Sequence, residues 1–402
     1  MTRSARVTDP DEAFGEKNFY LEEFRGRSVL LALDPAIATE RPDLGDLAKV
    51  VADLVRSDTR VLLWWPIATP GGERRLLAAL ARAKALPRRA GTRRRTRPVV
   101  RVDMATLDAR DEQADLRAQI WEHLRVGHLC VLTVRGFADF PQHPADLAAA
   151  LRVPKVVLID DDGGLVVGGG RMSFVDEAVL DMLLQDGEAE WSGLGHRREF
   201  LRIVRATLGK GVEAMNLCTL SGLAEELFSY VGAGTLFTRG DYCRIEPLGL
   251  DQFAQAERLI ERGHRDGYLK GRSSEEVAQV LAGGVGALIG GRSLAGVAAL
   301  VSAPYEADHC GEIVSLYTIT RFKGEGVGER LVRRLVEEAT EQHLTFVFAC
   351  AVEEHAQAFF DRLGFERVAP EDVPAAKWAG YDIKRRRKLG VFKRWLTEPV
   401  RA

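Results

Sequence analysis

A glycine-rich loop near the end of the chain is the segment best suited to chemistry. The run from Glu312 to Leu331 reads as a strand, a tight loop that contains Gly324, Gly326 and Gly328, and a helix from about Val327. A pyrophosphate needs convergent backbone N–H donors, and a helix N-terminus supplies them together with the positive end of the helix dipole. Glycines in this pattern also serve simple strand-to-helix turns. The loop alone therefore leaves both phosphate binding and a plain turn open.

The loop and a downstream segment resemble the cofactor site of the GNAT acetyltransferases. The stretch from Arg321 to Gly328 is similar to the family motif R/Q-x-x-G-x-G/A, which follows the fourth strand and holds the pyrophosphate of coenzyme A, with Lys323 at the leading basic position. The stretch from Ala356 to Phe365 resembles the family's helix that ends in a Leu-Gly-Phe turn. The resemblance implies acetyl-CoA as co-substrate, no metal, and a cofactor site made of Ser315, Leu316, Thr318, Lys323, Gly324, Gly326, Val327, Gly328 and Glu329.

The general acid of such a site stays unassigned. Many family members carry a tyrosine near the position of Phe360, where it protonates the departing thiolate. Phe360 is instead expected to pack its helix against the sheet. The family's serine after the fifth strand corresponds to Cys350 or Ala351.

Over nearly its whole length the chain resembles the N-acetylglutamate synthases, in which an amino-acid-kinase-like domain precedes a GNAT domain. In the first domain the resemblance rests on Phe24–Arg27, Lys155–Leu165 and Glu226–Thr235. It implies a three-layer parallel sheet over residues 18–239 and a GNAT α/β fold over residues 241–398. It also implies that the enzyme transfers acetyl from acetyl-CoA to the α-amine of L-glutamate, giving N-acetyl-L-glutamate and CoA, the first step of arginine biosynthesis.

Acyl transfer to an amine requires a base and donors for the oxyanion, and glutamate also requires cations for its two carboxylates. Glu312 opens the strand before the glycine loop and matches the family's base, and a surface charge at a strand end is the other interpretation. Arg272, Lys377 and Arg386 match basic positions that hold the acceptor. A guanidinium matches a carboxylate better than an ammonium does, so Lys377 is the weaker match. Residues 385–388 also read as a solvated strand edge.

The first domain lacks the residues that phosphoryl transfer needs. Active kinases of the resembled fold place a lysine and glycines after the first two strands, where this chain has Leu33–Ala36 and Trp64–Ile67. These segments supply no lysine and bring in prolines, which have no N–H donor. The resemblance implies instead a domain that builds a homo-oligomer and binds L-arginine as effector at Tyr20, Glu226 and Gly232, although packing explains Tyr20 equally well.

The elements that must position these residues follow from the hydrophobic pattern. Apolar strands recur between amphipathic helices in the first half, at residues 28–33, 60–65, 128–134 and 155–159. Such alternation favours a parallel sheet with helices on both faces. A turn near residue 240 begins the second domain, for which we expect helices at 250–262 and 274–281 and strands at 285–289, 296–302, 312–320 and 345–349.

Composition sets the remaining limits. A length of 402 residues predicts two domains, and 46% hydrophobic with 28% charged residues is typical of globular proteins. A net charge of -2 gives no global attraction to nucleic acid or anionic membranes, and the arginines between Arg88 and Arg97 read as a solvated loop in preference to a polyanion patch. Five scattered cysteines indicate neither a disulfide framework nor a zinc site. Without an apolar signal core or a stretch of roughly 18 apolar residues, the protein is predicted to be cytoplasmic.

Two alternatives to glutamate acetylation stay open. The same cofactor motif permits another small amino acid as acceptor, because a fold does not fix its substrate. A non-catalytic, arginine-sensing scaffold would keep both folds and bind CoA without turnover. Acetyl transfer to a panel of amino acids separates the three.

Overall fold

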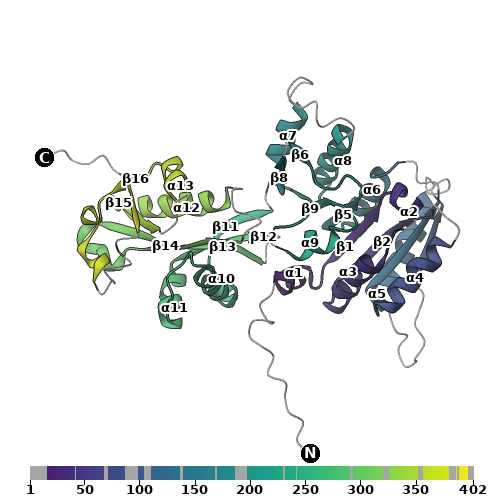
Figure 1. Cartoon of the computed structure of the whole chain (residues 1–402), viewed down its shortest axis with the longest axis horizontal. Coiled ribbons are helices and arrows are strands. Elements are labelled where there is room, and N and C mark those ends of the chain that lie inside the picture. The colour runs from purple at the N-terminus through teal and green to yellow at the C-terminus, as the bar shows by residue number, and fades with distance from the viewer. Residues whose placement is uncertain are drawn as a thin grey trace, which may run out of the picture. The chain divides into compact units, whose positions relative to one another are not determined.

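The chain forms two compact units, Met1–Gly240 and Asp241–Ala402, each built on its own sheet (Figure 1). The computed structural model describes residues 16–40, 42–67, 71–86, 98–103, 110–135, 139–167, 170–185, 197–229, 231–240, 242–289, 293–319, 326–351, 356–379, 386 and 389–396. Within these ranges, no helix combines the length and the apolar character needed to cross a membrane.

The first unit is built on an eight-stranded sheet that is parallel except between β9 and β10. In spatial order its strands are β3 (Val99–Asp103), β4 (Leu129–Arg135), β2 (Arg60–Pro66), β1 (Ser28–Leu33), β5 (Lys155–Ile159), β9 (Ala214–Cys218), β10 (Thr235–Thr238) and β8 (Phe174–Asp176). A separate hairpin pairs β6 (Val166–Val167) with β7 (Gly170–Arg171). The parallel sheet predicted from the apolar strands is present.

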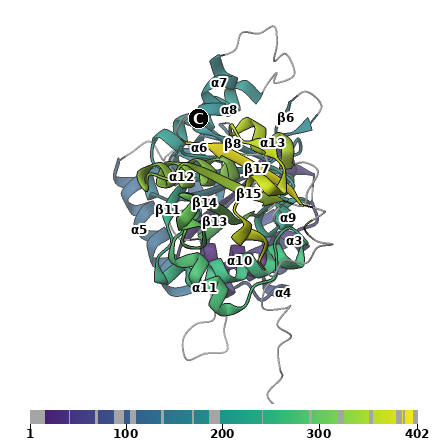
Figure 2. The same ribbon diagram turned by 90° about the vertical axis from the view of Figure 1, so that its left-hand side faces the viewer.

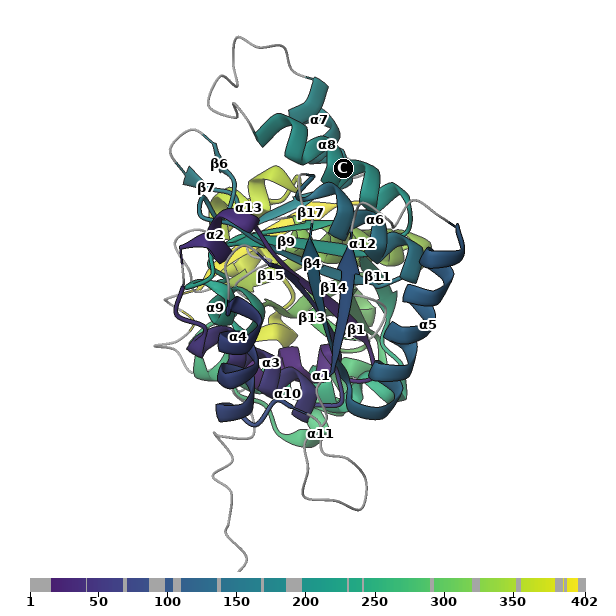
Figure 3. The same cartoon turned by 90° about the vertical axis from the view of Figure 1, so that its right-hand side faces the viewer.

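Helices cover both faces of this sheet (Figure 3). One face carries α5 (Arg110–Gly127), α6 (Gln142–Leu151), α7 (Glu177–Gln185) and α8 (Arg197–Gly209). The other carries α1 (Glu16–Phe24), α3 (Gly45–Arg56), α4 (Gly72–Arg82) and α9 (Leu223–Phe228), while the short α2 (Pro35–Thr39) follows β1. The result is three layers.

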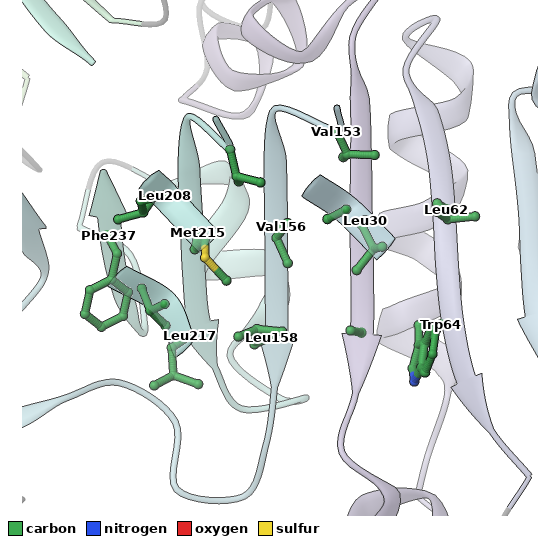
Figure 4. Close-up of a cluster of buried hydrophobic side chains, with 14 of the residues drawn as sticks. Leu30, Leu62, Trp64, Val153, Val156, Leu158, Leu208, Met215, Leu217 and Phe237 are labelled. Atoms are coloured by element: carbon green, nitrogen blue, oxygen red, sulfur yellow. The ribbon is translucent and has the colours of Figure 1, made fainter. Parts of the chain in front are cut away.

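The core of the first unit follows from the alternation of side chains along each strand. Leu30, Leu62 and Val156 lie on the face covered by α5 to α8, together with Met215 of β9 (Figure 4). Their chain neighbours point to the opposite face, because successive side chains in a strand alternate. Those neighbours are buried too. Burial on both faces explains why these strands read as continuous apolar runs.

The second unit has a seven-stranded, mainly antiparallel sheet in which only β14 and β15 are parallel. In spatial order its strands are β11 (Cys243–Pro247), β12 (Gly284–Ile289), β13 (Ser293–Val301), β14 (Cys310–Thr318), β15 (Phe346–Ala351), β17 (Gly390–Trp395) and β16 (Glu366–Val368). The helices α10 (Phe253–Arg265) and α11 (Ser274–Ala282) lie on one face (Figures 1 and 2). The helices α12 (Val327–Glu341) and α13 (Ala356–Arg362) lie on the opposite face.

Candidate active site

The two parallel strands of the second unit separate part of the way along. β14 pairs with β15 from Cys310, opposite Phe346, to Ile313, opposite Ala349. Beyond Ile313, β14 continues beside β13 alone, while β15 continues beside β17. One edge of β14 therefore carries backbone donors and acceptors that no described strand uses, which is the kind of edge to which an extended ligand can bind.

A β-bulge lies at the start of this open edge. Val314 pairs with Ala299 and Tyr317 pairs with Val297, so Ser315 and Leu316 together oppose one residue of β13. Ser315 is buried and has a φ of 55°, in the left-handed region that a side chain disfavours. Such bulges re-aim backbone groups beside functional sites. The predicted cofactor residues Ser315, Leu316 and Thr318 all lie on this edge segment.

The helix α12 begins at Val327, where the glycine loop predicted it. Gly326 is its N-cap residue, with a φ of 73°, and Arg330 donates its backbone N–H to Gly326 O at 2.8 Å. No residue in the described part of the chain accepts a hydrogen bond from the N–H groups of Val327, Gly328 or Glu329. These orphan donors at a helix N-terminus fit the pyrophosphate of a coenzyme A molecule. Lys323 and Gly324 lie outside the described residues.

Glu312 occupies a buried position inside β14. The strand begins at Cys310, two residues earlier than predicted, because Cys310 and Gly311 already pair with β15. Glu312 is only 6% exposed, so it is not a surface charge at a strand end.

Both carboxylate oxygens of Glu312 are engaged. Tyr305 Oη donates to Oε2 at 2.7 Å, and Lys377 Nζ forms an ion pair with Oε1. Tyr305 belongs to the 3-10 helix η3 (Ala303–Asp308) and Lys377 to η6 (Ala375–Trp378). Lys377, predicted to hold an acceptor carboxylate, here lies against the predicted base instead.

Glu312, Tyr305 and Lys377 form a cluster whose surroundings are apolar. Tyr305 packs edge-on against Phe348 with ring centroids 5.1 Å apart, in a core group that also contains Phe346 and Val391. Burial and the adjacent carboxylate raise the pKa of Tyr305, so its hydroxyl stays protonated. Burial raises the pKa of the Cys350 thiol to about 12. Glu312 therefore lies beside a tyrosine and a cysteine that hold their protons near neutral pH.

The predicted packing role of Phe360 agrees with its surroundings. Phe360 is buried, stacks on Phe392 at 4.8 Å between ring centroids, and meets Phe365 edge-on at 5.2 Å. Gly364, with a φ of 75°, makes the turn after α13. The Leu-Gly-Phe turn thus fixes α13 against the sheet.

Arg272 lies in the loop between α10 and α11, one residue before the N-cap Ser273. The start of this loop is tied to β14, because Tyr317 Oη donates to Asp266 Oδ2 at 2.7 Å and Arg262 Nε donates to Tyr317 Oη at 3.2 Å. Within the described ranges, no side chain forms a hydrogen bond or ion pair with the Arg272 guanidinium. Arg272 is therefore placed on an anchored loop with its charge available to a ligand.

Arg386 stacks on an aromatic ring next to Lys377. Its guanidinium lies 4.5 Å from the centroid of the Trp378 ring and 2.8 Å from Glu371 Oε1. Trp378 Nε1 donates to Pro370 O at 2.7 Å, which fixes the ring. Residues 380–385 and 387–388, which flank Arg386, lie outside the described part of the chain.

Two of the predicted effector residues of the first unit, Glu226 and Gly232, already form hydrogen bonds within the chain. Glu226 is fully buried, accepts from the backbone N–H groups of Ala233 at 3.0 Å and Gly234 at 2.7 Å, and also accepts from Asn216 Nδ2. Gly232 has a φ of 67°, and its carbonyl oxygen accepts from Arg171 Nη1 at 2.7 Å.

Tyr20 is buried in α1, which packs against the helix α9 that carries Glu226. The three predicted effector positions therefore belong to one region of the first unit.

Charged side chains lie at the carboxyl ends of β1 and β5. The strand order reverses between these two strands, which is where parallel sheets of this kind bind ligands. Arg197 forms a buried ion pair with Asp160 there, and its Nη2 donates to Gly163 O at 3.1 Å. Asp34 follows β1 and caps α2 through a 2.7 Å bond from Ala36 N. Asp34, Asp160 and Arg197 thus occupy part of this edge.

Sequence reasoning missed Tyr305 and Tyr317. Both contact predicted site residues through side chains that no local periodicity connects, since Tyr305 reaches Glu312 from a 3-10 helix and Tyr317 reaches back to Asp266. The only available signal was the aromatic hydroxyl itself, which for Tyr317 stands in a largely apolar strand. In the described ranges, no group of three or more His, Cys, Asp or Glu side chains is placed to hold a metal ion.

The fold of the second unit is that of an acetyltransferase domain. Residues 251–365 match the acetyltransferase (GNAT) family, and these residues span α10 to the turn after α13.

The chain as a whole is similar to amino-acid acetyltransferases. It is 25% identical to the amino-acid acetyltransferase of Neisseria meningitidis serogroup A over 321 residues, which are 76% of this chain and 70% of the relative. It is 24% identical to that of Ralstonia nicotianae over 244 residues, 60% of this chain and 52% of the relative.

The fold of the whole chain is that of a solved relative. The crystal structure of N-acetylglutamate synthase from Neisseria gonorrhoeae, complexed with coenzyme A and L-arginine, superimposes with a TM-score of 0.58 at 19% identity, over 97% of this chain and 100% of that chain. The predicted fold class, an amino-acid-kinase-like sheet followed by a GNAT fold, is confirmed. The match to the acetyltransferase (GNAT) family agrees with the expectation of acetyl-CoA as co-substrate.

Proposed function

We propose that this chain transfers the acetyl group of acetyl-CoA to the α-amine of L-glutamate, giving N-acetyl-L-glutamate and CoA. Relatives named amino-acid acetyltransferases support an amino acid as the acceptor. The observation that carries the proposal is the buried carboxylate of Glu312, on the strand whose edge opens directly after Ile313. A carboxylate in that place serves a reaction that must remove a proton from an amine.

In the proposed reaction Glu312 takes a proton from the acceptor ammonium, and the neutral amine attacks the thioester carbonyl carbon. Backbone N–H groups on the open edge of β14, from Ser315 to Thr318, donate to the carbonyl oxygen as it gains charge. The nitrogen of the tetrahedral intermediate gives up its second proton, the C–S bond breaks, and CoA leaves as a thiolate that takes up a proton.

Cys350 is poorly suited to supply that last proton. Burial raises the pKa of its thiol to about 12, whereas an ordinary thiol has a pKa of about 8.5, so the transfer would be uphill by about 5 kcal/mol. Phe360 has no proton to give. Neither of the residues at the family's acid positions is therefore assigned as the donor of that proton.

Two arginines are the proposed clamps for the acceptor carboxylates. Arg272 presents a guanidinium from an anchored loop, and the partner of Arg386, Glu371, has a 73% exposed side chain. An exposed ion pair contributes about 0–1 kcal/mol, so a substrate carboxylate can displace Glu371 from Arg386 at small cost. Guanidinium groups also bind carboxylates through two parallel hydrogen bonds. Lys377 is already engaged with Glu312.

The first unit, residues 18–239, is proposed to regulate and assemble the enzyme rather than to phosphorylate. The ion pair between Arg197 and Asp160 lies at the edge where ligands bind in parallel sheets of this kind, which supports this proposal. The solved relative from Neisseria gonorrhoeae is complexed with L-arginine. A homo-oligomer and an L-arginine response remain predictions.

Thiol release from acetyl-CoA, measured with a panel of amino acids in the presence and absence of L-arginine, tests the proposal. We expect turnover with L-glutamate that falls at least about a hundredfold in Glu312→Gln and a large rise in the KM for glutamate in Arg272→Ala. Preferred transfer to another amino acid would replace glutamate as the acceptor. Coenzyme A binding without transfer to any amino acid would contradict the enzyme and favour a scaffold.

A further inference from the structure

We propose that Tyr305 and Lys377 are positioning residues that hold Glu312 ionised and fixed at both oxygens, and that they set the lower pH limit of catalysis. The inference rests on the proposed function in so far as Glu312 is the base. It assigns Lys377 to the base rather than to the acceptor, and it adds a tyrosine that the sequence did not single out.

Three separate elements bring these groups together. The carboxylate of Glu312 comes from β14, the Tyr305 hydroxyl from η3 and the Lys377 ammonium from η6. Each donor takes a different oxygen, Tyr305 at Oε2 and Lys377 at Oε1. The side chains of Lys377 and Glu312 are 12% and 8% exposed. A carboxylate held at two points cannot rotate, so its free lone pairs keep one direction.

Burial makes the two donors necessary. An isolated carboxylate with this little exposure would be strongly disfavoured as an anion and would take up a proton. An opposite charge and a hydrogen bond to the anion both favour the ionised form. Only the ionised form of Glu312 can accept a proton from the acceptor ammonium. The two donors therefore keep the base in the state that the reaction uses.

The other titratable groups around Glu312 do not supply this effect. Cys350 of β15 and Cys310 of β14 lie near the cluster, and burial raises the pKa of both thiols to about 12, so they are neutral. The charge of Asp308 of η3 raises the pKa of the Cys310 thiol, and that of Lys393 of β17 lowers it. Lys393 Nζ lies 3.9 Å from the centroid of the Phe346 ring. Among the described residues, Lys377 is the cation that contacts the carboxylate.

The test is the pH dependence of kcat/KM in Tyr305→Phe, Lys377→Met and Lys377→Arg. Tyr305→Phe keeps the ring that packs on Phe348 and removes only the hydroxyl. We expect the acidic limb of the profile to move to higher pH by about one unit in Tyr305→Phe and by about one to three units in Lys377→Met. Lys377→Arg keeps the charge, and its acidic limb should stay near that of the wild type. Lys210→Met removes a surface lysine of the first unit and should leave the profile unchanged.

Two outcomes would overturn the inference. A lower kcat or melting temperature with an unmoved acidic limb in both Tyr305→Phe and Lys377→Met would mean that the contacts only support the fold. A raised KM for glutamate in Lys377→Met, again with an unmoved limb, would return Lys377 to the acceptor carboxylate.

A titration that needs no turnover separates this inference from the proposed function. Infrared difference spectra of the wild type against Glu312→Gln isolate the carboxylate band of Glu312, and the same band is followed with pH in Tyr305→Phe. Movement of that titration to higher pH in a protein that acetylates nothing would retain the positioning role while the proposed reaction fails. A titration unchanged by Tyr305→Phe would contradict the positioning role of Tyr305 whether or not the enzyme turns over.

Discussion

Tyr317 ties the loop that carries Arg272 to β14, and removal of its hydroxyl tests whether that tie positions the arginine. The hydroxyl donates to Asp266 Oδ2 at 2.7 Å and accepts from Arg262 Nε at 3.2 Å. Burial raises the pKa of Tyr317, so this donor is present throughout the neutral range. Tyr317→Phe keeps the ring and its packing with Tyr268, whose centroid lies 6.3 Å away.

The expected magnitude follows from the exposure of the partner. A hydrogen bond to a charged group contributes about 1.5–3 kcal/mol, but the Asp266 side chain is 37% exposed and keeps Arg262 at 3.6 Å. Water and Arg262 therefore replace part of the lost bond, and we expect a loss of about 1 kcal/mol. When the bond serves to hold Arg272 in place, that loss appears as a roughly fivefold higher KM for glutamate with kcat unchanged.

The assay is steady-state thiol release with Tyr317→Phe, Arg272→Ala and the double variant. Because both changes act on one carboxylate clamp, their effects on the KM for glutamate should not add. Tyr242→Phe, which alters another buried tyrosine of the second unit, serves as the matched control. Additive effects, or a KM that rises for acetyl-CoA and not for glutamate, would refute the reasoning and assign Tyr317 to the open edge of β14.

Three further predictions concern other parts of the chain. Gly326→Ala places a side chain in the left-handed region, which costs about 1 kcal/mol or more, so the KM for acetyl-CoA should rise about fivefold while the KM for the acceptor stays constant in steady-state kinetics. Arg171→Ala frees the carbonyl oxygen of Gly232, and L-arginine should bind several-fold more tightly by calorimetry if it uses that oxygen; unchanged binding would place the effector elsewhere. Burial raises the pKa of the Cys130 thiol to about 12, so the folded chain keeps a proton that the unfolded chain releases above about pH 9. The free energy of unfolding should therefore fall by about 1.4 kcal/mol per pH unit for this thiol between pH 9 and 12, and Cys130→Ala should remove that part of the slope in denaturant titrations.

Much of the fold could be predicted because local patterns determine it. The bounds of β1 and β5 follow from runs of apolar residues that are buried on both faces, and α12 begins where the last glycines of the loop end. The helix α5 was not predicted. Its exposed face carries Trp121, which is 69% exposed. An apolar residue on the solvent side weakens the alternation of apolar and polar faces from which a helix is predicted.

For the site, the sequence could indicate single residues but not the contacts between them. The sequence indicated Glu312 and Lys377 separately, but their ion pair joins residues 65 positions apart, and no local pattern encodes such a contact. Glu226 shows the same limit, because its carboxylate bonds to Asn216 of β9 and to the turn at Ala233. Residue types and spacing indicated which groups carry charge, whereas the topology of the strands decides which charges meet.

The ion pair with Glu312 explains why residue 377 is a lysine. An ammonium is a compact charge that engages a single oxygen, and here it engages Oε1 and leaves Oε2 to the Tyr305 hydroxyl. A guanidinium presents a planar fork that matches both oxygens of a carboxylate at once. An arginine at position 377 would therefore keep the charge but compete with Tyr305 for Oε2. The single-point geometry that made Lys377 a weak match for a substrate carboxylate suits it to share the carboxylate of the proposed base. Arg272 and Arg386 remain the proposed cations for the acceptor.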